Sequence, residues 1–412
     1  MNVLFISLLD FNSLEERNIY TDLLREFRKY NHKIYAISPI ERRNCGESKI
    51  IHEENCIILK LRIGNIQKTN IFEKGISTIT IGNQLVKGIR KYFSDVKFDL
   101  VIYPTPPITI VDAIDFVKKR DNAKSYLLLK DIFPQNAVDL GMMSKSGVKG
   151  FIYKSFRQKE KKLYKISDYI GCMSQANVDY LLKHNSEINP KIVEICPNSV
   201  DIIDMSVDFE TSKEIRKKYD LPLDKKIFIY GGNLGKPQGI DFMIECLKKQ
   251  ESNKSIFFLI VGDGTEFTKI EKYILDDQPS NVRLMKSLPK KDYDKVVAAC
   301  DIGMIFLDHR FTIPNFPSRL LSYIQAKIPV LAVTDCNTDI GEVIVNNNIG
   351  CWCESNNVDN FTSALESILQ LENANFDKLA KEYSTKNSYE IIMNSVINRE
   401  NRVLCASSVQ LI

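Results

Sequence analysis

Residues 226–236 read KIFIYGGNLGK, and this stretch decides the predicted fold class. The apolar run 226–230 is short and rich in β-branched and aromatic residues, which is typical of a buried strand. Three glycines follow within five residues, and we expect a helix to start near Gln238. A strand that passes through a glycine turn into a helix is the repeating unit of a parallel sheet covered by helices. The stretch therefore predicts an α/β domain.

The glycine turn is also a candidate ligand site. Glycine lets the backbone approach a ligand closely, and the free N–H groups of a following helix attract anions. The spacing excludes a Walker A loop, because Tyr230 stands where the first glycine would be and Pro237 follows Lys236. A phosphate-binding loop is one interpretation, and a tight turn that binds nothing is the other.

The same alternation of short apolar runs and amphipathic stretches extends along the whole chain. Expected strands are 2–7, 33–38, 56–61, 98–103, 124–129, 168–172 and 191–195 in the first half, and 226–230, 256–261, 281–284, 301–306, 329–333 and 349–353 in the second. Between the two sets, residues 197–211 are polar and without periodicity, as expected of a hinge between domains.

We predict an α/β protein of two Rossmann-like, doubly wound domains, at 1–204 and 205–386, followed by a C-terminal helix and tail at 387–412. Open parallel sheets bind ligands beyond the carboxyl ends of their strands. We therefore expect the two domains to face each other across a ligand-binding cleft, with the site in the loops after the strands.

The composition excludes several classes of protein. Of the 412 residues, 44% are hydrophobic and 26% are charged, which is typical of a folded globular protein and not of a disordered one. The net charge of +4 is too small for a dedicated nucleic-acid binder. The apolar runs fall short of the roughly 18 residues that a membrane span needs. The first residues lack the features of a signal peptide, so a cytoplasmic protein is expected.

No metal site is expected. The four His, at 32, 52, 184 and 309, are scattered, and no second Cys or His pair accompanies Cys351 and Cys353. Asp292 and Asp294 have a spacing that could hold a metal ion, but acidic residues are favoured at a helix start in any case.

A second glycine turn follows the predicted strand 256–261. Gly262, Asp263 and Gly264 would begin a dinucleotide-binding fingerprint, but Phe267 occupies the position of the third glycine. This departure argues against a dehydrogenase.

The stretch 307–319, LDHRFTIPNFPSR, follows the predicted strand 301–306. Pro317 suits the first position of a helix and would place Ser318 and Arg319 in its first turn, where a cation is disfavoured unless an anion is bound. The pattern predicts a diphosphate site at Arg319. The alternative is that Arg319 points to solvent or pairs with a carboxylate.

Three features of the first domain could be functional or structural. Asp131, after strand 124–129, would contact a ligand, cap the following helix or pair with Lys130. Ser13 and Glu16 have the spacing of a capping box for the first helix. Residues 145–165 carry eight basic residues, one acid and an apolar helical stripe, so they would bind an anionic membrane surface or pack on their own domain with a solvated lysine face.

Taken together, YGGNLGKPQGID at 230–241, VGDG at 261–264, and PSR at 317–319 followed by AKIPV at 326–330 resemble the donor domain of family 4 GT-B glycosyltransferases. KDIFPQNAVDLG at 130–141 resembles the N-acetylfucosaminyltransferase-like subgroup of surface-polysaccharide biosynthesis. The resemblance covers nearly the whole chain. It implies a GT-B fold with an acceptor-binding first domain, a donor-binding second domain and a C-terminal helix that crosses back to the first domain.

The resemblance also implies site residues. The donor-binding set is Gly231, Gly232, Asn233, Lys236, Gly262, Asp263, Gly264, Ser318, Arg319 and Ser322. Asp131 and Arg319 are the expected catalytic residues. The sequence departs from the family where its paired glutamates would fall, at Pro314 and Ser322, so neither carboxylate is available for contact with the sugar or the ribose.

The expected function is retaining transfer of a sugar, such as an N-acetylated amino sugar, from a UDP-sugar to a lipid-linked saccharide in capsule or O-antigen assembly. No metal or other cofactor is expected, and no nucleic-acid partner. Residues 145–165 would hold the enzyme on the inner face of the plasma membrane. Two alternatives stay open: a UDP-sugar epimerase, which would need titratable groups to move protons, and a non-catalytic scaffold of a polysaccharide assembly complex.

Overall fold

The structure is a computed structural model that describes the backbone of residues 1–65 and 71–408, with side chains except at 71–79, 148–149 and 398–408. The chain divides into two compact units, Met1–Asp201 with Thr385–Ile412 (unit 1) and Ile202–Ser384 (unit 2). The predicted boundary lay after residue 204. The C-terminal segment, predicted as a separate element from 387, begins at Thr385 and is part of unit 1.

Unit 1 is built on an eight-stranded sheet of order β3-β4-β2-β1-β5-β6-β7-β8. Its strands are β1 (Asn2–Ile6), β2 (Lys33–Glu41), β3 (Lys49–Glu53), β4 (Cys56–Ile63), β5 (Leu100–Pro104), β6 (Lys124–Leu129), β7 (Tyr169–Cys172) and β8 (Val193–Ile195). The seven predicted strands are confirmed with shifted ends. The prediction missed β3, a partly exposed edge strand that pairs antiparallel with β4 and lacks a long apolar run.

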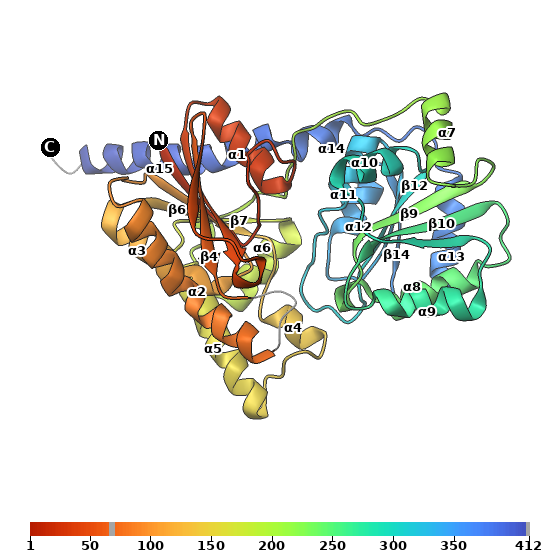
Figure 1. The fold of residues 1–412 in the computed structure, drawn as a ribbon, viewed down its shortest axis with the longest axis horizontal. Coiled ribbons are helices and arrows are strands. Elements are labelled where there is room, and N and C mark those ends of the chain that lie inside the picture. The colour runs from red at the N-terminus through yellow and green to blue at the C-terminus, as the bar shows by residue number, and fades with distance from the viewer. Residues whose placement is uncertain (66–70, 409–412) are drawn as a thin grey trace. The chain divides into compact units, whose positions relative to one another are not determined.

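Helices cover both faces of this sheet (Figure 1). Along β1, Leu4 and Ile6 enter one core and Val3 and Phe5 enter the other, as the two-residue period of a strand requires. The helices of unit 1 are α1 (Ile19–Lys29), α2 (Ile71–Tyr92), α3 (Val111–Asp121), α4 (Gln135–Asp139), α5 (Gly147–Ile166), α6 (Gln175–His184) and α15 (Thr385–Ser408).

The C-terminal helix α15 packs on α1. The ring of Tyr389 stacks on Tyr30 with 4.2 Å between centroids, and its hydroxyl lies 2.9 Å from His32 Nε2. Ile392 and Met393 enter the core beside Phe27. The returning helix therefore completes the fold of unit 1, as expected.

Unit 2 repeats the plan with a parallel six-stranded sheet of order β11-β10-β9-β12-β13-β14. The strands are β9 (Lys226–Asn233), β10 (Ile256–Asp263), β11 (Val282–Met285), β12 (Ile302–Phe306), β13 (Val330–Thr334) and β14 (Gly350–Glu354), and all six were predicted. The order of strands reverses between β9 and β12. The loops that follow these two neighbouring strands therefore open at the same edge of the sheet, where doubly wound folds bind ligands.

The helices of unit 2 pack over this sheet around a core that Phe228, Tyr230 and Phe306 share. They are α7 (Phe209–Lys218), α8 (Ile240–Lys249), α9 (Phe267–Asp277), α10 (Lys290–Ala298), α11 (Leu320–Ala326), α12 (Ile340–Asn346), α13 (Val358–Leu369) and α14 (Asp377–Glu382).

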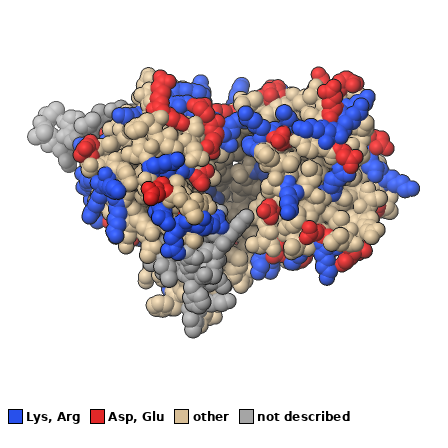
Figure 2. All heavy atoms as spheres, viewed as in Figure 1, with Lys and Arg blue, Asp and Glu red and all other residues tan. Residues whose placement is uncertain are grey.

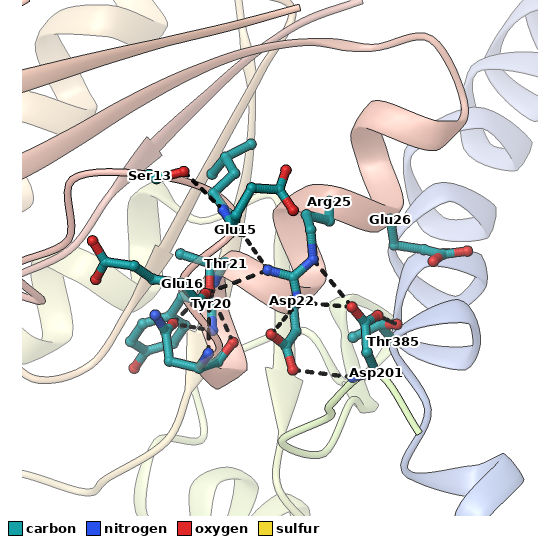
Figure 3. Close-up of polar contacts among 12 residues, drawn as sticks. Ser13, Glu15, Glu16, Tyr20, Thr21, Asp22, Arg25, Glu26, Asp201 and Thr385 are labelled. Carbon is teal, nitrogen blue, oxygen red and sulfur yellow. Dashed lines mark hydrogen bonds and ion pairs between the residues drawn. The ribbon is translucent and has the colours of Figure 1, made fainter. Parts of the chain in front are cut away.

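One arginine holds together the two points where the chain leaves and re-enters unit 1 (Figure 3). Arg25 Nη2 donates to Asp201 Oδ2 (2.7 Å) and also pairs with the buried carboxylate of Asp22. Asp201 Oδ1 accepts a hydrogen bond from Thr385 Oγ1 (2.9 Å). Arg25 donates as well to the carbonyl oxygen of Leu14, so the loop between β1 and α1 is fixed by the same group.

The start of α1 differs from the prediction. The helix begins at Ile19, and Asn18 caps it in a capping box that Thr21 completes. The capping box predicted at Ser13 and Glu16 is wrong. Glu16 Oε1 instead accepts a hydrogen bond from Asn12 N (2.8 Å), which closes the turn that precedes the helix.

The described part of the chain contains no helix that could span a membrane, and its visible face carries charges of both signs (Figure 2). Among the residues that the structure describes, every helix is too short or too polar to cross a bilayer. Figure 2 shows basic and acidic side chains intermingled over the visible face, in keeping with the small net charge of +4.

Candidate functional site

The two glycine turns of unit 2 lie side by side. Strands β9 and β10 pair in parallel so that Gly232 stands opposite Gly262 and Asn233 opposite Asp263. A Cβ atom on Gly262 would lie 2.0 Å from the Gly232 carbonyl oxygen, a distance that no side chain tolerates. Glycine is therefore required at 262 for the two turns to approach each other.

Hydrogen bonds from a side chain of the same segment stabilise the first glycine turn. Gln238 is buried, and its Oε1 accepts hydrogen bonds from Asn233 Nδ2 (3.1 Å) and Gly235 N (3.1 Å). Gly232 has a φ of +124°, which favours glycine. Lys236 is exposed. A short 3₁₀ turn, Lys236–Gln238, precedes α8, so the helix begins at Ile240, close to the predicted start.

Arg319 lies against the first glycine turn. Its guanidinium carbon is 4.2 Å from the centroid of the Tyr230 ring, and its Nη2 atom would be 3.7 Å from a Cβ on Gly232. Nη1 is buried and has no hydrogen-bond partner among the described residues. No ion pair of Arg319 with a carboxylate is found in that part of the chain either. Arg319 thus neither points freely to solvent nor is neutralised, the two alternatives that the sequence left open.

The local structure around Arg319 corrects the prediction in one respect. Helix α11 begins at Leu320, and residues 318–319 form the turn before it, so Pro317 is not the first helical residue. Ser318 is exposed, and Ser322 lies half-buried on α11. Arg319 is the residue directly before α11, at the N-terminal end of this helix, and its guanidinium contacts the Tyr230 ring.

Two further tyrosines complete the surroundings of Arg319, and the sequence did not point to them. Tyr323 of α11 donates to the carbonyl oxygen of Met304 (2.9 Å), which fixes α11 on β12. The Tyr293 hydroxyl of α10 would lie 1.7 Å from a Cβ on Gly231, so only glycine fits at 231. Burial raises the pKa of both hydroxyls, which therefore stay neutral.

The loop after β12 is tied to the first glycine turn. Asp308 N donates to the Pro237 carbonyl oxygen (3.0 Å), and the carboxylate of Asp308 binds the Arg310 side chain (2.6 Å). The same backbone contact brings Gly239 close to Asp308, where a Cβ on the glycine would lie 3.3 Å from the Asp308 Cα. Burial works against the charged form of Asp308, but the hydrogen bonds and charge of Arg310 hold the pKa of this carboxyl below its usual range. Arg310 is therefore neutralised where Arg319 is not.

The positions of the family's paired glutamates offer no carboxylate here. Pro314 is buried in the loop after β12, and the Ser322 hydroxyl stands on α11. The loop is anchored by the segment between β13 and α12, because Thr338 Oγ1 donates to the Asn315 carbonyl oxygen. Neither of these two positions therefore offers a carboxylate, and Asp308 of the same loop is paired with Arg310.

No metal site is seen. Within the described ranges, no group of three or more His, Cys, Asp or Glu side chains could hold a metal ion. Asp294, one of the two carboxylates with a suggestive spacing, is buried and pairs with Lys290 of the same helix.

In unit 1, Asp131 follows β6 at the carboxyl edge of the sheet. Its Oδ2 accepts a hydrogen bond from Asn136 Nδ2 (2.8 Å), whereas Oδ1 is buried without a partner among the described residues. Burial raises the pKa of Asp131 to about 6, although Asn136 and the Ile132 backbone N–H pull it the other way. Asp131 does not cap α4, and Lys130 Nζ donates to the Cys196 carbonyl oxygen (3.5 Å) instead of pairing with it.

The apolar residues of the predicted stripe on α5 fall into two groups, one buried and one exposed. Phe156 and Leu163 pack into the core of unit 1, as the structural alternative required. Phe151 and Ile152, in contrast, are 77% and 48% exposed near the start of the helix. The side chain of Val148 lies outside the described residues.

Some basic side chains of α5 form ion pairs and others do not. Arg157, Lys161 and Lys162 pair with Glu160, Glu187 and Asp112. Lys154, Lys159 and Lys165 have no ion pair in the described part of the chain, so unpaired positive charge is spread along the helix.

The architecture of the two units matches a known fold. Two doubly wound α/β units, the second with a glycine-lined switch point beside an unneutralised arginine, form the GT-B glycosyltransferase fold. A solved Escherichia coli structure described as trehalose-6-phosphate bound with UDP-2-fluoro glucose has this fold, with a TM-score of 0.70 at 8% identity over 96% of this chain and 99% of that one.

The sequence comparisons place the second unit more narrowly. Residues 211–387 match the family model of glycosyl transferases group 1. WbjE of Pseudomonas aeruginosa, named as a glycosyltransferase, is 24% identical over 71% of this chain and 72% of its own. WcaI of Escherichia coli (strain K12), named as a glycosyl transferase of colanic acid biosynthesis, is 22% identical over 73% of this chain and 74% of its own.

Proposed function

We propose that the protein is a glycosyltransferase of polysaccharide biosynthesis that moves a sugar from a UDP-sugar to a lipid-linked saccharide, with retention at the anomeric carbon. The match of residues 211–387 to the group 1 family model and the relative WcaI support the reaction class and the process. The bound UDP-sugar analogue in a structure of the same fold supports the donor. The resemblance of residues 130–141 to N-acetylfucosaminyltransferase-like enzymes favours an N-acetylated amino sugar as the transferred group.

The observation that carries the proposal is the unneutralised charge of Arg319 at the switch point of unit 2. A guanidinium binds two phosphate oxygens at once through parallel N–H donors. Nη1 of Arg319 is buried and has no hydrogen-bond partner in the described part of the chain, and Gly232, which has no side chain, leaves the adjoining backbone open. A diphosphate placed here would meet a fixed cation and the backbone of two glycine turns.

The chemistry follows from this placement. Breaking the bond between the sugar and the diphosphate puts negative charge on the leaving group, and donors already fixed at that position stabilise the transition state more than the ground state. Arg319 would supply this stabilisation, with Lys236 adding charge from the exposed side of the turn. Gly231, Asn233, Gly262, Asp263 and Gly264 would line the same donor site, with Ser318 and Ser322 beside Arg319.

Calorimetric titration with UDP, GDP and ADP, with and without magnesium, tests the donor site. We expect selective UDP binding that does not need the metal and that Arg319→Ala weakens. Arg283→Ala is the matched control, because Arg283 belongs to the same unit but is already paired with Asp220. Absence of nucleotide binding would favour the scaffold instead, and conversion of a UDP-sugar without any acceptor would favour an epimerase.

Asp131 is the proposed catalytic contact of unit 1. Its buried Oδ1 has no hydrogen-bond partner among the described residues, and an unsatisfied buried oxygen costs free energy unless a ligand donates a hydrogen bond to it. A sugar hydroxyl is such a donor. Asp131→Asn should therefore lower turnover while UDP affinity stays unchanged, and equal turnover would remove Asp131 from the mechanism.

We propose further that α5 holds the enzyme on the cytoplasmic face of the plasma membrane. Exposed Phe151 and Ile152 would enter the headgroup region, and Lys154 and Lys159 would attract anionic lipids. Co-sedimentation with vesicles that contain anionic lipid tests this. Phe151→Ser with Ile152→Ser should reduce binding, whereas Leu275→Ser, which removes an equally exposed apolar residue of unit 2, should not.

The paired lysines of α5 provide a second control for the vesicle-binding test. Lys154→Gln with Lys159→Gln should weaken vesicle binding more than Lys161→Gln with Lys162→Gln, because the latter two already pair with carboxylates. Binding that no α5 variant changes would overturn the membrane proposal.

A further inference from the structure

Unit 1 contains a pocket that no step of the proposed reaction uses, although Ile132, the residue after Asp131, is part of its lining. It has a volume of about 120 Å³ and is lined by residues of α5, of α6 and of the segment from β6 to the start of α4, together with Lys145. Cavities of about 150 Å³ hold a benzene-sized ring, so the pocket has room for one six-membered ring or a little less. Three tyrosines line it, Tyr153 and Tyr164 from α5 and Tyr180 from α6.

The aromatic walls are held in place by other side chains. The Tyr180 ring stacks on His184 with 4.0 Å between centroids, and the Tyr164 hydroxyl donates to Glu160 Oε1 (2.7 Å). Burial, helped by the charges of Asp139 and Glu160, raises the pKa of Tyr180 to about 12, so its hydroxyl stays protonated. The pocket therefore offers neutral ring faces with hydroxyl groups at their rims.

The charges on the lining do not cancel. Arg157 is saturated within the protein, because it donates to Glu160 Oε2 (2.5 Å) and to Asn185 Oδ1 (2.6 Å). Lys145 is exposed, and its ammonium lies 5.7 Å from the centroid of the Tyr153 ring. No carboxylate pairs with Lys145 in the described part of the chain. Asp139 does not line the pocket, and its carboxylate accepts a hydrogen bond from Gln135 Nε2 (2.6 Å).

We propose that this pocket binds an acidic sugar unit, a single pyranose ring whose carboxylate or phosphate group faces Lys145. A pyranose has apolar C–H faces that pack on tyrosine rings and hydroxyls that bond with polar side chains, and the lining provides both. An apolar ring would give the exposed ammonium of Lys145 no anionic partner. A free anion would leave the tyrosine faces without a partner.

The binding itself needs no donor nucleotide and no transfer reaction. Its use would be to recognise a charged sugar already present in the saccharide that is extended, and this last step rests on the proposed function. Because the pocket belongs to unit 1 and the nucleotide site to unit 2, Arg319→Ala should leave acidic-sugar binding unchanged. Failure of the pocket and failure of the donor site can therefore be told apart.

Ligand-observed NMR titration of the full chain tests the inference, with glucuronic acid, glucose 6-phosphate, glucose and inorganic phosphate as probes. We expect at least one of the two acidic sugars to bind about tenfold or more tightly than glucose and than phosphate. Lys145→Gln should abolish this preference, and Lys191→Gln, an exposed lysine of the same unit, should not.

A second pair of variants separates the aromatic wall from the charge. Tyr153→Leu should lower the affinity for the acidic sugar about tenfold, whereas Tyr153→Phe, which keeps the ring, should retain it. Equal binding of glucose and its acidic derivatives, binding of phosphate as tightly as of the sugars, or indifference to Lys145→Gln would each overturn the proposal.

Discussion

The guanidinium of Arg319 lies 4.2 Å from the centre of the Tyr230 ring, and no carboxylate neutralises it among the described residues. The two residues are far apart in sequence, yet β9 and the loop after β12 bring them together at the switch point of one sheet. A ring face holds a cation without cancelling its charge. The arrangement therefore keeps Arg319 in position and available for an anion.

Replacement of the Tyr230 ring should weaken nucleotide binding. A cation–π contact that is shielded from water contributes about 1–2 kcal/mol, so Tyr230→Leu should raise the Kd of UDP about tenfold because the arginine is no longer positioned. Tyr230→Phe keeps the ring and should bind UDP nearly as well. Calorimetry on both variants checks this, and equal losses would assign the effect to the hydroxyl, which donates to the Asn233 carbonyl oxygen (2.7 Å).

A methyl group at Gly231 should disturb the site through Tyr293. The added Cβ would lie 1.7 Å from the Tyr293 hydroxyl, so we expect Gly231→Ala to cost about 1–3 kcal/mol of stability and to weaken UDP binding. In a Tyr293→Ala background, the same change should cost much less. Urea unfolding of the two single variants and the double variant measures this coupling, and additive costs would show that the clash is relieved elsewhere.

Asp131 should make stability depend on pH. Its pKa is raised to about 6 by burial, whereas the unfolded chain has the ordinary value of about 3.9. Between about pH 4 and pH 6 the unfolded chain has lost this proton and the folded chain still holds it, so stability falls as the pH rises. Relative to Asp131→Asn, the wild type should lose up to about 3 kcal/mol across this window. Parallel unfolding free energies for the two proteins from pH 4 to pH 7.5 would contradict the shift.

Arg25 should matter more for stability than a neighbouring arginine on the same helix. Arg25→Met leaves the buried Asp22 carboxylate without its partner, and breaking such a buried pair costs about 3 kcal/mol or more. Arg28→Met removes an ion pair with the exposed Glu15 and should cost less than about 1 kcal/mol. Thermal and urea unfolding compare the two, and similar costs would show that Arg25 does not anchor the passages at Asp201 and Thr385.

Much of the fold and part of the site could be predicted from the sequence. Parallel strands of a doubly wound sheet place their following loops at one edge, so the turns at Gly232 and Gly262 and the loop that carries Arg319 had to meet there once the strands were found. The start of α11 was predicted too early because Pro317 is compatible with a helix start and with the loop before one.

The rest depended on contacts between distant segments. Tyr293 belongs to α10, and its sequence neighbours indicated only the start of a helix. The sequence pattern did not show that the Tyr293 hydroxyl lies against Gly231. The cations Lys161 and Lys162 read as a free basic face because their partners, Glu187 and Asp112, come from other elements. The tyrosine pocket also needs α5 and α6 side by side, which no periodicity specifies.

The measurement that tests the central claim most directly is a comparison of UDP and uridine affinities for the wild type and for Arg319→Ala. If Arg319 binds the diphosphate, the substitution should weaken UDP about thirtyfold or more, which corresponds to about 2 kcal/mol, and should leave uridine affinity unchanged. Equal weakening of both ligands, or no weakening of UDP, would show that Arg319 does not bind the diphosphate and would contradict the account.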